Sequence, residues 1–229
     1  KGLILNNLAE IYEKMGEEKN KEWLHSVQPD TVLRLNNFAY FHYKEGKYAK
    51  AELYYQLVQA IYEQQSGGIH PDMAASLNNL AELYRAQGKD AEAEPLLKQA
   101  LAISQRQLGT RHPNTAASLN NLAALYKTQG KYIEAIQLYK QALAISQHQL
   151  GTWHLNTTTY LNNLGELYRA QGKYTKAESL LKRALAIYER QSGNMYPEMA
   201  NCLNNLALLY TNQGKYDQAK PIYQRALTL

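Results

Sequence analysis

The sequence is organised around a tripeptide that returns at a fixed interval. Leu-Asn-Asn begins at residues 5, 35, 77, 119, 161 and 203, and the last four intervals are 42 residues each. Residues 70–111 and 112–153 are identical at 30 of their 42 positions. A period of this length predicts an array of similar units, each of which buries its apolar face only by stacking on its neighbours.

Each repeat has the apolar periodicity of two helices. Leu77, Leu80, Ala81 and Tyr84 lie at i, i+3, i+4 and i+7, which places them on one face of a first helix. A proline suits the first turn of that helix and a glycine its end, and the sequence offers both in each complete 42-residue repeat except 154–195, which lacks the proline. A second helix is expected from about residue 90 to 107, with small alanines that let the pair approach closely.

The repeat therefore predicts an all-α solenoid that forms a single domain. Its repeats are expected at 28–69, 70–111, 112–153, 154–195 and 196–229, with a partial repeat at 1–27. The first Leu-Asn-Asn interval is only 30 residues, so Lys21 falls where a core alanine is expected. Either the second helix is truncated there or residues are missing around Glu17–Lys21, and we favour the second. Since the chain starts at Lys1 without methionine, we interpret it as a fragment.

The motifs resemble the tetratricopeptide repeat, and more narrowly the 42-residue repeats of kinesin light chains. The resemblance rests on Leu-Asn-Asn-Leu-Ala-x-Leu-Tyr, on Gly-Lys-Tyr and on the spacing of Ala93, Leu97 and Ala100. It implies a right-handed superhelical solenoid of helix-turn-helix repeats, in which the first helices line a concave groove that binds an extended peptide. Kinesin light chains are known for binding short peptides that contain tryptophan and acidic residues.

The paired asparagines on the first helices need a physical reason, because Asn costs about 0.5 kcal/mol relative to Ala inside a helix. Two hypotheses remain open. The amides could bond across each junction as a ladder, or they could hold an extended peptide backbone through their donor and acceptor groups. The family resemblance favours ligand contact for the first asparagine of each pair: Asn36, Asn78, Asn120, Asn162 and Asn204.

Charged residues share this polar arc, and the cations Arg85, Lys127 and Arg169 suit an acidic ligand. Glu82 and Glu166 each precede a cation by one turn, so ion pairs within the helix are the alternative. Their presence also departs from an apolar lining suited to a cargo tryptophan.

The aromatic residues Tyr40 and Tyr43 stand where later repeats have Glu82 and Arg85, and His42 replaces the core tyrosine between them. This break in the template predicts either an aromatic pocket for a peptide side chain or an adaptation to an imperfect neighbouring repeat.

The sequence carries no motif for catalysis, and we predict no catalytic residue, metal or cofactor. His70, His112 and His154 lie one repeat apart, too far to share a metal, and are expected at helix starts. The single cysteine, Cys202, is expected to be buried, and Trp153 is either junction packing or an exposed contact. The net charge of +5 is interspersed, which does not favour nucleic acid, and no apolar run predicts a membrane helix.

The main hypothesis is a non-enzymatic, cytoplasmic interaction module that binds a protein or peptide partner in the groove. Two alternatives remain. The repeats could be the regulatory or sensor arm of a larger multidomain signalling protein, or an architectural spacer that self-associates end to end.

Overall fold

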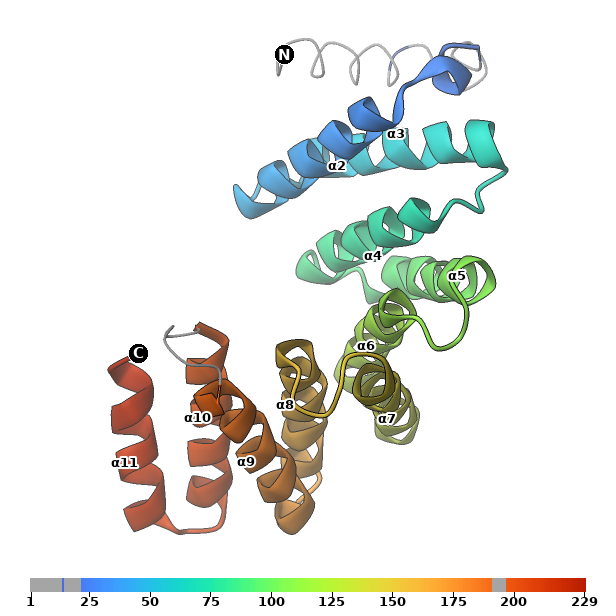
Figure 1. Cartoon of the computed structure of the whole chain (residues 1–229). Helices are drawn as coiled ribbons and strands as arrows, with labels where there is room; N and C mark the ends of the chain where they lie inside the picture. The colour runs from blue at the N-terminus through green and yellow to red at the C-terminus, as the bar shows by residue number, and fades with distance from the viewer. Residues whose placement is uncertain (1–13, 15–21, 191–196) are drawn as a thin grey trace. The chain divides into compact units, whose positions relative to one another are not determined.

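The structure is a computed structural model that describes residues 14, 22–190 and 197–229, and every regular element in these residues is a helix (Figure 1). The first helices of the successive repeats are α2 (Pro29–Lys44), α4 (Pro71–Ala86), α6 (Pro113–Thr128), α8 (Leu155–Ala170) and α10 (Pro197–Asn212). The second helices are α3 (Tyr48–Ser66), α5 (Asp90–Gln107), α7 (Tyr132–Gln149), α9 (Tyr174–Arg190) and α11 (Tyr216–Leu227). The predictions for residues 1–13 and 15–21, including that of missing residues around Glu17–Lys21, lie outside the described residues.

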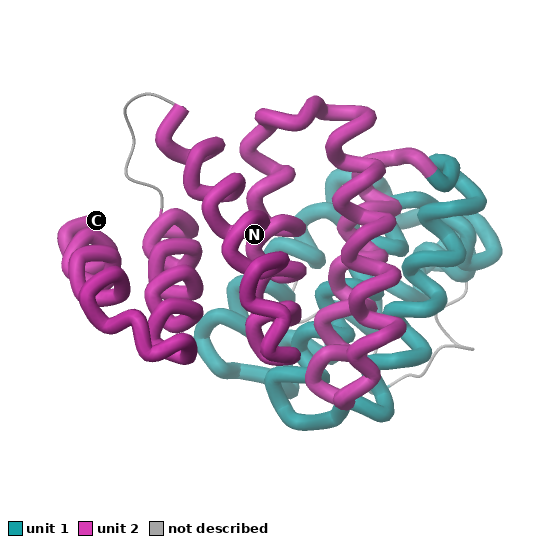
Figure 2. The backbone as a smooth tube through the Cα atoms, turned by 90° about the horizontal axis from the view of Figure 1, so that it is seen from below, with its two compact units in different colours: residues 1–110 teal, residues 111–229 magenta. Residues whose placement is uncertain are grey.

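The chain divides into two compact units, residues 1–110 and residues 111–229, which Figure 2 shows in different colours. Each unit is built in the same way. A first helix packs against its own second helix, and that second helix packs against the first helix of the next repeat. First helices of adjacent repeats also contact one another, α2 with α4 in the first unit and α6 with α8 and α8 with α10 in the second. One side of each unit is therefore made by first helices.

The helix ends are determined by the histidines and glycines of the template. His70, His112 and His154 are the N-caps of α4, α6 and α8, and each Nδ1 accepts the backbone N–H two residues later, at 3.1–3.2 Å. This bond satisfies one of the N–H groups that a helix start leaves without a partner. Gly88 follows α4 with a φ of +74°, in the left-handed region that glycine adopts without strain. These findings confirm the predicted helix starts and stops.

The core is formed by leucines and small alanines at the template positions. Ala93 and Ala100, the small residues expected to let the two helices of a repeat approach closely, are fully buried. Gly165 takes the place of Ala81 in α8, and a Cβ added there would lie 2.9 Å from the Leu181 Cγ. The α8–α9 pair is therefore packed more tightly than an alanine permits without rearrangement.

A tyrosine–glutamate hydrogen bond also joins consecutive repeats. The Tyr84 hydroxyl on α4 donates to the Glu52 carboxylate on α3 at 2.8 Å, and Tyr210 on α10 donates to Glu178 on α9 at the same distance. Burial and the bond to Glu52 raise the pKa of Tyr84 to about 12, so its proton stays in place. The template tyrosine thus packs in the core and links two repeats. None of the described helices is long and apolar enough to cross a bilayer.

Candidate functional site

The polar surface of the first helices carries the residues singled out by the sequence. We call the polar arc of the first helices within each unit its first-helix face, which is made by α2 and α4 in the first unit and by α6, α8 and α10 in the second. Its members are half-buried or exposed: Asn36, Asn78 and Arg85, then Asn120, Lys127, Asn162, Arg169 and Asn204. Each unit is considered in turn.

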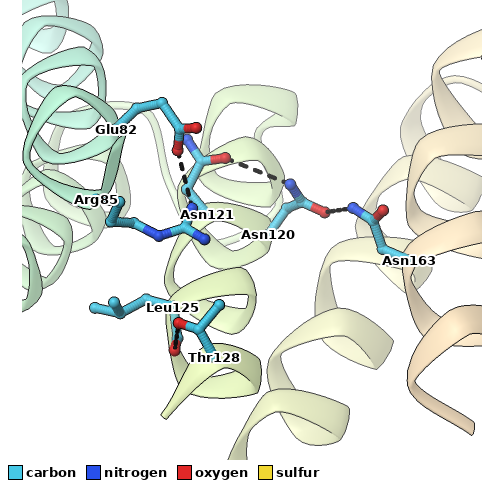
Figure 3. Close-up of polar contacts among 7 residues, drawn as sticks. All are labelled: Glu82, Arg85, Asn120, Asn121, Leu125, Thr128 and Asn163. Carbon is cyan, nitrogen blue, oxygen red and sulfur yellow. Dashed lines mark hydrogen bonds and ion pairs between the residues drawn. The ribbon is translucent and has the colours of Figure 1, made fainter. Parts of the chain in front are cut away.

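In the second unit, side-chain amides bond from one repeat to the next. The Asn163 Nδ2 on α8 donates to the Asn120 Oδ1 on α6 at 2.9 Å (Figure 3). In the same register, the Asn205 Nδ2 on α10 donates to the Asn162 Oδ1 on α8 at 3.1 Å. We call each of these bonds a rung. A rung joins residues 43 apart, so the second asparagine of one repeat is the donor and the first asparagine of the repeat before it is the acceptor.

The rungs explain why asparagine stands inside these helices. A net gain of about 1 kcal/mol for a partly buried hydrogen bond offsets the poor helix propensity of two asparagines. The ladder that the sequence left open is thus present at both junctions of the second unit. A ligand role for Asn120 and Asn162 remains a prediction, and it concerns their Nδ2 groups, since the oxygens accept the rungs. The Asn120 Nδ2 makes a long contact of 3.4 Å with the Asn121 Oδ1.

The cations of the first-helix face differ in their partners. Arg85 forms the predicted pair within its helix, with 2.9 Å between its Nη1 and the Glu82 carboxylate (Figure 3). Glu166 on α8 instead pairs with Lys127 on α6, with 2.8 Å between its Oε2 and the Lys127 Nζ. The alternative pair within the helix, Glu166 with Arg169, is therefore not the one that forms. With the Asn212 amide turned to satisfy its neighbours, its oxygen accepts from the Arg169 Nη1 at 3.1 Å. Arg169 therefore meets an amide where the other two cations meet carboxylates.

The first unit lacks the corresponding rung. Asn36 and Asn79 are 43 positions apart, as the rung partners of the second unit are, yet the Asn36 Oδ1 is buried without a hydrogen-bond partner among the described residues. A hollow of about 440 Å³ lies between α2 and α4, and both asparagines line it. The sequence pattern could not reveal this hollow, because the same Asn pair is present at every repeat.

The predicted aromatic residues form a surface cluster at the C-terminal end of α2. The Tyr40 and Tyr43 ring centroids are 6.3 Å apart, Tyr48 continues the cluster from α3, and Tyr40 is 49% exposed. The Lys44 Nζ lies 5.2 Å from the Tyr40 ring centroid, a distance at which a cation is attracted by the ring. Burial and the nearby Glu82 raise the pKa of Tyr43, so its hydroxyl remains a neutral donor.

His42 belongs to the core beneath this cluster. It is buried and stacks on Tyr54, with 5.6 Å between the ring centroids and 6° between the ring planes. Burial lowers the pKa of His42, with further lowering by Lys47 and Lys50, and only Glu45 opposes it. Histidine therefore fills the place of the template tyrosine as a neutral ring.

The other residues with possible chemistry have structural surroundings. Cys202 is fully buried, its Sγ donates to the Leu181 carbonyl at 3.5 Å, and burial raises the pKa of the thiol to about 12. Trp153 is 49% exposed, with the Arg190 guanidinium 5.2 Å from its ring centroid. Within the described ranges, no group of three or more acidic, histidine or cysteine side chains could hold a metal ion.

A second hollow of about 480 Å³ lies in the second unit, on its second-helix side. It is formed by α7, α8 and α9, and Leu143, Leu164 and Tyr168 give it an apolar surface. Lys140 and Lys176 also line it. It contains none of the predicted site residues.

Comparisons with known proteins agree with the repeat architecture. The model of the family described as tetratricopeptide repeat matches residues 31–106, 72–148 and 155–229. A search of curated proteins gives no significant match.

Several solved structures are similar over most of the chain. BtubC (BKLC) from P. vanneervenii is 26% identical with a TM-score of 0.75, and the match covers 93% of this chain and 87% of that one. A structure of the nearly identical TPR-like repeats of a putative kinesin light chain from Podosopora anserina has 27% sequence identity to this chain and a TM-score of 0.72. The match covers 88% of this chain and 95% of that one. A Rap protein complexed with Competence and Sporulation Factor is 20% identical with a TM-score of 0.71, covering 85% and 52%, and is similar in fold alone. The predicted all-α repeat fold and its kinesin-light-chain-like type are confirmed.

Proposed function

This chain belongs to the tetratricopeptide repeat family, and we propose that it is a non-catalytic module that holds an extended segment of a partner protein against its first-helix face. The observation that carries the proposal is the state of the side-chain amides. The rungs hold Asn120 and Asn162 in fixed positions on rigid helices while leaving both residues half-exposed. Their Nδ2 groups are then preorganised donors for the carbonyl groups of an extended backbone.

The ion pairs change the expected charge of that segment. Lys127 and Arg85 already meet carboxylates, so an acidic ligand would have to displace Glu166 or Glu82 to reach them. Among the described residues, Arg169 meets the amide of Asn212 rather than a carboxylate, and its Nε, like that of Arg85, is buried without a partner. We therefore propose one acidic contact at Arg169 within a segment of otherwise mixed charge.

The remaining predicted residues lie on the first helices of their own units. Asn204 is exposed on α10, and Tyr40 and Tyr43 offer an aromatic surface on α2. Tyrosines of this kind provide contact area at a small loss of side-chain freedom, which suits a peptide side chain. The proposal also places the chain in a reducing, cytoplasmic setting, where the buried Cys202 stays a thiol.

A selection from a random peptide library tests the proposal directly. Enriched peptides are measured against the native chain, against Arg169→Ala on the first-helix face and against Lys220→Ala, which removes an exposed cation from α11. Loss of a charge-assisted contact at Arg169 is expected to weaken binding about tenfold, with no change for the control. Thermal unfolding of both variants is measured alongside, and both are expected to keep the melting temperature of the native chain.

Two results count against a peptide receptor. Either no peptide is enriched, or the enriched peptides bind both variants as tightly as the native chain. The spacer hypothesis is then examined by light scattering, where a mass that rises with protein concentration indicates self-association.

A further inference from the structure

The hollow in the first unit has a chemistry of its own. It lies between the N-terminal halves of α2 and α4, has a volume of about 440 Å³ and is closed on one side by the end of α3. Val32 contributes an apolar wall, and Ala75 contributes only a methyl group. A volume of this size is close to that of small-molecule sites, so it admits one large side chain of a partner.

An acceptor without a donor lines this hollow. In the second unit, Asn120 and Asn162 accept a rung through their Oδ1 atoms. The equivalent Asn36 Oδ1 is buried and has no partner among the described residues, although Asn79 stands in the donor position. A buried acceptor left unpaired costs about 1–3 kcal/mol, and a bound donor removes that cost.

The charges around the hollow are of one sign. Asp30 and Asp72 line it, and its lining within the described residues includes no lysine or arginine. Acidic residues in a first helical turn also interact with the helix dipole, so their presence alone does not indicate a ligand. Here they stand beside a hollow and an unpaired acceptor, which the helix dipole does not explain.

An aromatic pair completes the lining. The Tyr62 and His70 rings stack with 4.8 Å between their centroids and 11° between their planes. His70 accepts the Asp72 backbone N–H through its Nδ1, which fixes the ring beside the carboxylate. The hollow thus combines acceptors, negative charge and flat aromatic surface, and its described lining contains no lysine or arginine.

We propose that this hollow binds the side chain of an arginine from the partner segment. The guanidinium is planar, stacks on aromatic faces and presents five N–H donors, enough for both carboxylates and the Asn36 oxygen. A lysine ammonium is compact and strongly hydrated, so it matches the aromatic pair less well. The inference rests on the proposed function in that the arginine is supplied by the bound segment.

The test uses N-acetyl-L-arginine N-methylamide, which carries the side chain without a peptide. Binding to the whole native chain is followed by NMR, beside the citrulline analogue, which has the same shape without charge, and the lysine analogue. We expect the arginine analogue to bind about tenfold more tightly than the citrulline analogue, because the uncharged citrulline side chain forms no charge-assisted hydrogen bonds. Equal affinity for citrulline overturns the charge recognition, and equal affinity for lysine overturns the preference for guanidinium.

Variants locate the site. Asp30→Asn with Asp72→Asn is expected to weaken arginine binding about tenfold, whereas Asp217→Asn, a first-turn acid of α11 outside the hollow, leaves it unchanged. Ala75→Leu fills the hollow from an exposed helix position and is expected to abolish binding with the melting temperature retained. Unchanged binding in both hollow variants refutes the site.

The outcome is separable from that of the proposed function. Enriched library peptides together with no arginine binding would leave the peptide receptor standing and remove the arginine site. Arginine binding together with no enriched peptide would leave the arginine site standing and remove the peptide receptor.

Discussion

Replacing Asn163 by alanine removes the donor of one rung, and the geometry of that rung predicts the resulting change in the free energy of unfolding. The Asn163–Asn120 bond, with a donor–acceptor distance of 2.9 Å and partial burial, contributes about 1 kcal/mol net. Alanine returns about 0.5 kcal/mol through its better helix propensity. Each single variant, Asn163→Ala or Asn120→Ala, should therefore lose about 0.5 kcal/mol of unfolding free energy. In the double variant the bond is lost once and the propensity gained twice, so its stability should match that of the native chain.

The quantity to measure is the coupling energy of the double-mutant cycle, from urea unfolding of the native chain and its three variants. We expect a coupling of about 1 kcal/mol between Asn120 and Asn163. The matched control crosses the rungs: Asn120→Ala combined with Asn205→Ala removes one partner from each of two separate bonds. Its two effects should add to within about 0.5 kcal/mol. A coupling in the rung pair no larger than in the crossed pair would refute the ladder as the reason for the asparagines.

Three further predictions concern the core. Burial lowers the pKa of His42 in the folded chain, so the unfolded chain binds more protons at acid pH. The contribution of neutral His42 to the unfolding free energy should be complete above about pH 6.5 and should be lost as the pH falls through the folded pKa. Melting temperatures at pH 5 and pH 7.5 should therefore differ less in His42→Tyr than in the native chain. Burial raises the pKa of the Cys202 thiol to about 12, against 9.0 for an exposed thiol. The thiol should therefore react with a thiol reagent at pH 8 about a thousandfold more slowly in the folded chain than in denaturant, and equal rates would contradict its burial. Gly165→Ala gains about 1 kcal/mol in helix propensity but crowds Leu181, at a cost of about 2 kcal/mol, so a lower melting temperature is expected and a higher one would show that the α8–α9 pair relaxes freely.

The repeat fold could be predicted from the sequence because helix signals and packing signals coincide in one template. The 3.6-residue spacing of Leu77, Leu80 and Ala81 specifies which face is buried, and the glycine at position 88 specifies where the helix ends. These are properties of a single repeat, so no knowledge of its neighbours is needed.

The partners of the polar residues depend on a neighbouring repeat and could be predicted only in part. A ladder was foreseeable as one of two hypotheses, but the assignment of donor and acceptor requires the 43-residue register seen in the structure. The partner of Glu166 differs for the same reason, since Lys127 on α6 competes with Arg169 on its own helix. The hollow beside Asn36 depends on how two helices are spaced, which no motif encodes.

The offset of the rungs has a consequence for how such a chain changes in length. Two neighbouring asparagines in one template supply an acceptor to the repeat that follows and a donor to the repeat that precedes. The contact is head-to-tail, so it does not close on itself. Duplication of a 42-residue block of the second unit would therefore bring both halves of its new junction with it, and this part of the array can be lengthened without a new kind of contact.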